Sequence, residues 1–75
     1  MNKYITMLKA AKSKQDIRDV TYEAFKDNEI TGKQHEVLTS LGVLKEIYIQ
    51  GKNAGEVNEC ISVLHIPKKY AMMIK

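Results

Sequence analysis

Four side chains near the C-terminal end are the best candidates for chemistry in this sequence. They are Lys68, Lys69, Met72 and Lys75, and they follow the single proline in the stretch IPKKYAMMIK. Adjacent lysines in the first turn of a helix can bind phosphate together with the free backbone N–H groups of that turn. The macrodipole disfavours cations at that place, and an anionic partner would offset this cost. The pattern predicts an anion-binding helix end; two solvated lysines after a proline are the simpler interpretation.

Residues for catalysis or metal binding do not form a usual pattern. The two histidines, His35 and His65, lie in different segments without a neighbouring nucleophile, and there is no glycine-rich phosphate loop. The stretch that begins at Asp27 has the start of a calcium loop, but its twelfth position is Leu38, where such a loop needs a glutamate. We therefore predict no enzyme activity, no metal ion and no cofactor.

Length, composition and charge describe one small domain covering residues 1–75. The chain has 44% hydrophobic and 28% charged residues and a formal net charge of +3, which is ordinary for a globular protein apart from its slightly basic balance. Met1 to Ser40 contain 7 basic and 6 acidic residues, whereas residues 60–75 contain three lysines and no acid. We therefore expect an anionic partner to bind at the C-terminal end.

The single cysteine, Cys60, excludes an internal disulfide. Free cysteine is among the most buried residue types, so we expect Cys60 in the core of a reduced, cytoplasmic protein. The first residues, MNKYITMLKAAK, lack the apolar run of a signal peptide. No segment approaches the ~20 apolar residues that cross a bilayer, so no membrane partner is expected.

Apolar residues recur at spacings of three and four along almost the whole chain, which predicts an all-α bundle of four to five helices. The expected helices cover residues 3–11, 14–27, 32–49, 54–64 and 67–75. Ser13, Thr31 and Asn53 precede three of them and can cap their first N–H groups. A strand over KEIYIQG is the alternative for the end of the third helix, although it would lack a partner strand.

The apolar stripes of these helices predict the core. Phe25 is expected to be the main anchor of the second helix. Gly42 interrupts the third stripe at a cost of roughly 1 kcal/mol relative to alanine; it could break the helix or permit close approach of a neighbour. We expect one continuous helix because the stripe keeps its phase. The predicted core residues are Phe25, Val37, Leu38, Leu41, Leu44, Val57, Ile61 and Leu64.

Residues 56–75 resemble the helix-turn-helix unit of phage repressors and small bacterial transcription regulators. The apolar positions that match its spacing are Cys60, Ile61, Leu64, Ile66, Ala71 and Ile74. His65 stands where this unit usually has a glycine, and Ile61 where it has a small alanine. The resemblance implies a C-terminal helical hairpin whose DNA-facing residues are Lys68, Lys69, Met72 and Lys75.

Two functions fit these observations. The leading hypothesis is a small DNA-binding regulatory protein of phage or mobile-element type, which acts by site occupancy through residues 54–75. The alternative is a small helical inhibitor or adaptor that docks on a larger host protein. Met72 and Met73 favour this second function, because methionine adapts to irregular partner surfaces. A homodimer would suit either function, since a second copy adds buried apolar surface to a small domain.

Overall fold

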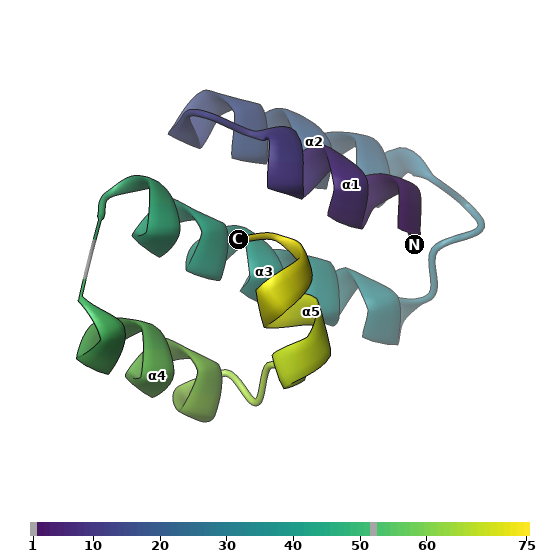
Figure 1. Ribbon diagram of the computed structural model, residues 1–75. Helices are drawn as coiled ribbons and strands as arrows, with labels where there is room; N and C mark the ends of the chain where they lie inside the picture. Colours follow the sequence, from purple (N-terminus) through teal and green to yellow (C-terminus); the bar gives the residue numbers. More distant parts are fainter. Residues whose placement is uncertain (1, 52) are drawn as a thin grey trace.

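The computed structural model describes residues 2–51 and 53–75, which contain five helices and no strand. The all-α prediction is confirmed, and the helix ends differ from the predicted ones by at most two residues. The strand alternative for KEIYIQG is wrong, because most of this stretch belongs to the end of the third helix. The helices are α1 (Asn2–Ala10), α2 (Lys14–Lys26), α3 (Gly32–Ile49), α4 (Ala54–Val63) and α5 (Lys68–Met73) (Figure 1).

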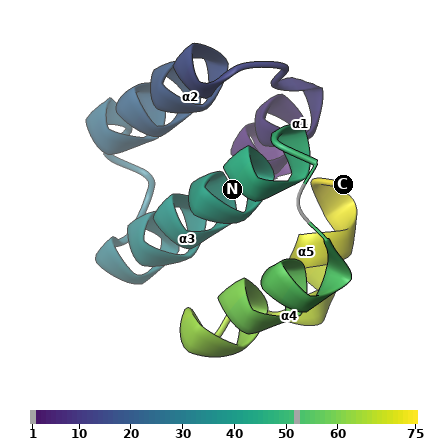
Figure 2. The ribbon, with the colours of Figure 1, turned by 90° about the vertical axis from the view of Figure 1, so that its left-hand side faces the viewer.

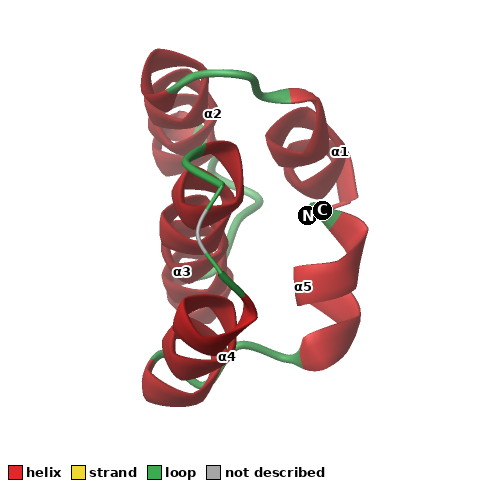
Figure 3. Ribbon diagram, turned by 60° about the vertical axis from the view of Figure 1, so that its left-hand side comes forward, coloured by secondary structure: helices red, strands yellow, loops and turns green. Residues whose placement is uncertain are grey.

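The helices form two layers (Figures 1 and 3). One layer contains α2, α3 and α4, and Figure 2 shows α2 and α4 on opposite sides of α3. The other layer contains α1 and α5, which pack against each other and against α3. The first and last helices of the chain therefore lie in the same layer.

Three helices begin at caps that the sequence predicts. Ser13, Thr31 and Asn53 each accept a hydrogen bond from the backbone N–H three residues further on. Gln34 completes a capping box, because its side chain accepts from the Thr31 N–H at 3.0 Å. Gly51 follows α3 with a φ of 71°, the left-handed conformation that commonly ends a helix.

The core is centred on α3. Leu38, Leu41 and Leu44 are buried as predicted, and Val37, Val57 and Ile61 are half-buried against them. A large part of the core comes from α1, α2 and the C-terminal segment, whose buried residues are absent from the predicted core. The other buried apolar residues are Tyr4, Ile5, Leu8, Ala11, Ile17, Val20, Ala24, Ile66, Ala71 and Ile74.

Phe25 and Leu64 do not belong to the core, so these two predictions are wrong. Phe25 is 75% exposed. The buried stripe of α2 passes through Ala24, and the next residue points about 100° away around the helix. The Phe25 ring instead meets the edge of the His35 ring, with centroids 5.8 Å apart. Leu64 caps α4, which packs mainly on α3, and this one-sided packing leaves it partly exposed.

Gly42 lies where α2 and α3 approach closely. A Cβ atom at this position would lie 3.2 Å from Cγ2 of Ile17 and 3.6 Å from Cγ2 of Thr21. The helix is continuous through the glycine, as predicted. The close approach of a neighbouring helix is therefore the structural role of Gly42.

A hydrogen bond between Tyr4 and Asp27 ties α1 to the end of α2. The Tyr4 hydroxyl donates to Asp27 Oδ2 at 2.6 Å. This bond raises the pKa of Tyr4 to about 12 and lowers the pKa of Asp27. Because the phenol pKa is raised on folding, the bond stabilises the fold below the usual value of 10.0 and is lost as the pH rises towards about 12.

Candidate functional site

The final helix divides sharply into a buried and an exposed side. Ala71 and Ile74 are buried, and Tyr70 is half-buried against the core. The exposed residues on and beside α5 include all four site residues predicted from the sequence, which are Lys68, Lys69, Met72 and Lys75. We call these four residues the α5 face.

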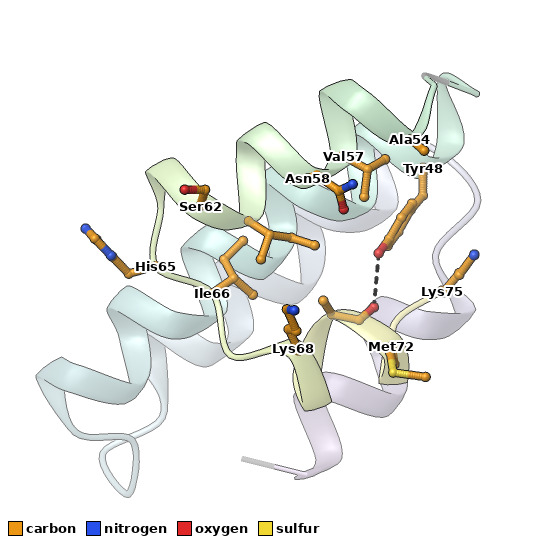
Figure 4. Close-up of a pocket in the computed structure, with 12 residues that line it drawn as sticks. Tyr48, Ala54, Val57, Asn58, Ser62, His65, Ile66, Lys68, Met72 and Lys75 are labelled. Carbon is orange, nitrogen blue, oxygen red and sulfur yellow. Dashed lines mark hydrogen bonds between the residues drawn. The ribbon is translucent and has the colours of Figure 1, made fainter.

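Two side chains of α3 hold α5 in place. The Tyr48 hydroxyl donates to the Ala71 carbonyl at 3.3 Å (Figure 4). Lys45 Nζ donates to the carbonyl oxygens of Ile74 and Lys9, both at 3.0 Å. Lys45 is only 7% exposed, and its charge lies at the negative C-terminal ends of α5 and α1. Lys45 therefore joins the C-terminal ends of α1 and α5, the two helices that share a layer.

Sequence reasoning missed Lys45. The available signal was a lysine directly after Leu44 in the apolar stripe of α3. Lysines beside such stripes usually extend to water, so this signal does not distinguish a buried lysine from an exposed one. The acceptors of Lys45 come from distant parts of the chain, and only the folded arrangement brings them together.

The turn between α4 and α5 contains a strained residue. His65 has a φ of 54°, the left-handed conformation. Its N–H donates to the Ser62 carbonyl at 3.3 Å, and the Ile66 N–H donates to the Ile61 carbonyl at 3.0 Å. These two bonds form a Schellman motif, in which glycine usually occupies the position of His65. It is also the position at which the resembled helix-turn-helix turn carries glycine.

We expect His65→Gly to stabilise the protein by about 1 kcal/mol, because glycine adopts the left-handed conformation without the steric cost that a side chain adds. Urea or thermal unfolding measures this change. Ser62→Gly is a suitable control, since Ser62 lies in the last turn of α4 and glycine there should destabilise, by roughly 0.5 kcal/mol relative to serine. A His65→Gly variant that is no more stable than wild type would contradict the assignment of strain to this turn.

A groove of about 1000 Å³ separates α4 from α5 (Figure 4). Val57, Ile61 and Met72 line it together with Lys68 and Lys75. The main contacts of α4 are with α3, whereas α5 packs on α1 and α3. Ile61 therefore lines an open groove between α4 and α5. The helix-turn-helix unit that this segment resembles has a small alanine at this position.

The α5 face is a surface and not one pocket. Lys68, Met72 and Lys75 line the groove, whereas the Lys69 ammonium lies 5.0 Å from the centre of the Tyr70 ring. Met72 is 76% exposed although it is apolar. The arrangement offers spread positive charge and one adaptable apolar contact, but no converging donors for a small ligand.

Cys60 is half-buried, so the predicted fully buried thiol is only partly correct. It packs against the core beside α3. Burial raises the pKa of the Cys60 thiol, which keeps it protonated and poorly reactive at neutral pH.

The described ranges of the chain are residues 2–51 and 53–75. They contain no group of three or more histidine, cysteine or acidic side chains that could hold a metal ion. Among the same residues, no helix combines the length and apolar character needed to cross a membrane.

Comparison with protein-family models, with curated proteins and with solved structures found no match to this chain. The resemblance of residues 56–75 to a helix-turn-helix unit therefore stays a prediction.

Proposed function

We propose that this protein binds DNA through the α5 face and acts by occupying a site, without catalysing a reaction. The observation that carries the proposal is the charge of this face. It has three exposed lysines, and no acidic residue follows Glu59 in the chain. Duplex DNA carries one negative charge per ~1.7 Å of its axis, so an acid-free group of exposed cations suits it well.

The residue types on the α5 face favour phosphates over bases. Lysine can contact guanine, but α5 contains no arginine, asparagine or glutamine, the residues that make most other paired contacts with base edges. The helix is also only six residues long, so it offers little length for the major groove. Lysine contacts to phosphate would position the protein on DNA with weak dependence on sequence. Occupancy of this kind would keep other proteins off the DNA that it covers, without selecting an operator by its base sequence.

The double substitution Lys68→Ala/Lys69→Ala should weaken DNA binding broadly. Each lost phosphate contact lowers the slope of log affinity against log salt by roughly 0.9, so the double variant should lose roughly 1.8. Both side chains are exposed, so the melting temperature should hardly change. The measurement is a salt titration of a labelled duplex, followed by fluorescence anisotropy.

The matched control is Arg18→Ala/Lys26→Ala, which removes two exposed cations from α2 in the other layer. It should leave the salt slope unchanged. Absence of wild-type binding at ~50 mM salt, where phosphate contacts are strongest, would overturn the proposed function.

A second candidate function is docking on a larger protein. The groove between α4 and α5 favours it, because the apolar stripe of α4 is only half-covered there. Exposed Met72 and Met73 could adapt to such a partner. The DNA titration distinguishes the two functions. If the protein does not bind DNA at low salt, docking on a larger protein becomes the favoured function.

A further inference from the structure

We infer that α1 belongs to the same phosphate-binding surface as α5, with Lys9 as a DNA contact from the opposite end of the chain. This inference rests on the proposed function and extends it to a helix that the sequence did not associate with binding. The two helices lie together in one layer of the fold (Figure 3).

The fold places the ends of α1 and α5 next to each other. The carbonyl oxygens of Lys9 and Ile74 both lie 3.0 Å from Lys45 Nζ. Lys75 directly follows Ile74, so the backbone positions of Lys9 and Lys75 are neighbours. Both side chains are exposed. An anion that reaches the end of α5 therefore also reaches the end of α1.

The distribution of acids makes this layer distinct from the other one. All nine acidic residues of the chain lie between Asp16 and Glu59, a range that begins after α1 and ends before α5. The Asp27 carboxylate lies near the N-terminal end of α1, where it accepts a hydrogen bond from Tyr4. The positive charge of Lys3 contributes to lowering the pKa of the same carboxylate. At the other end of α1 the Asp16 carboxylate accepts from the backbone N–H of Lys12 at 2.9 Å. Lys9 is the lysine of α1 that lies next to the end of α5, and we therefore assign the contact to Lys9 and not to Lys3.

The partner that fits this surface is a polyanion. A single small phosphate group is usually held by several converging donors, whereas these lysines are exposed and spread over two helices. The repeating phosphates of duplex DNA can meet separate cations at once. Neither α1 nor α5 contains arginine or glutamine, and Asn2 is their only asparagine. Binding should therefore depend little on base sequence.

The test compares Lys9→Gln with Lys26→Gln on two labelled duplexes of unrelated sequence, each of roughly 20 base pairs. Each lysine is the basic residue in the last turn of its helix, and each is exposed. Lys9→Gln should lower the salt slope by roughly 0.9 and the affinity at ~100 mM salt roughly fivefold to tenfold, on both duplexes alike. Lys26→Gln should bind as wild type does.

Lys9→Arg keeps the charge and should bind like wild type, which assigns the loss in Lys9→Gln to charge and not to folding. If Lys9→Gln binds like Lys26→Gln while the Lys68→Ala/Lys69→Ala variant is weakened, the inference is wrong and the proposed function stands. If wild type binds neither duplex at ~50 mM salt, both are wrong. An affinity that differs more than about tenfold between the two duplexes would contradict recognition through phosphates alone.

Discussion

Leu41→Ala is expected to destabilise the protein by about 2–5 kcal/mol. Leu41 is fully buried at the centre of α3, the helix that contacts all four others. Removing its side chain costs the transfer energy of the lost methyl and methylene groups and leaves a cavity. Small domains have a total stability of only about 5–15 kcal/mol, so a large fraction of the molecules should unfold under mild conditions.

Urea unfolding followed by circular dichroism measures this loss. Val43→Ala is the matched control, because Val43 lies on the same helix but is 45% exposed. It should cost less than about 1 kcal/mol. If Leu41→Ala and Val43→Ala unfold at the same urea concentration, the buried side of α3 has been placed wrongly.

Lys45→Met is expected to destabilise the protein by about 1–3 kcal/mol. Methionine has a similar length and can fill the same space, but it cannot donate to the carbonyls of Lys9 and Ile74. Those carbonyls then lose their partner at a buried place. Relief from burying an ammonium group offsets part of this loss. The ends of α1 and α5 should therefore be held together less firmly. The effect would be internal, since Lys45 has almost no exposed surface.

Hydrogen exchange provides the most specific readout of this change. Amides of α5 should exchange faster in Lys45→Met than in wild type, beyond any change in α2. The control is Lys14→Met, because Lys14 is an exposed lysine 3.6 Å from Glu46 and such surface pairs contribute about 0–1 kcal/mol. Unchanged exchange in α5 would mean that Lys45 does not position this helix.

The features predicted correctly from the sequence are local ones. The capping residue Thr31 acts on a neighbour three positions away, and the stripe of α3 through Leu41 repeats over many turns. Such patterns act within a few residues, so no knowledge of distant contacts is needed. The same holds for Gly51, whose left-handed conformation depends on the helix end just before it.

The incorrect predictions depend on contacts between distant segments. Phe25 and Ala24 are adjacent and both apolar, and only the position of α3 decides which of them is buried. The candidate site also combines local and distant features. Its lysines on α5 were predicted from the charge distribution along the sequence, but the short distance from Lys9 to the end of α5 depends on the packing of α1 against α5. The role of Lys45 follows only from the fold, which places the carbonyl oxygens of Lys9 and Ile74 within hydrogen-bond distance of its ammonium group.

An NMR titration with duplex DNA tests the central claim most directly, because it reports binding at every backbone amide at once. At ~50 mM salt, where phosphate contacts are strongest, we predict that the largest amide shift changes occur in residues 68–75 and in α1 near Lys9. The amides around Tyr22 and Phe25, on the exposed side of α2, should hardly change. Shift changes concentrated around Tyr22 and Phe25, or no changes at all with saturating DNA, would contradict this account.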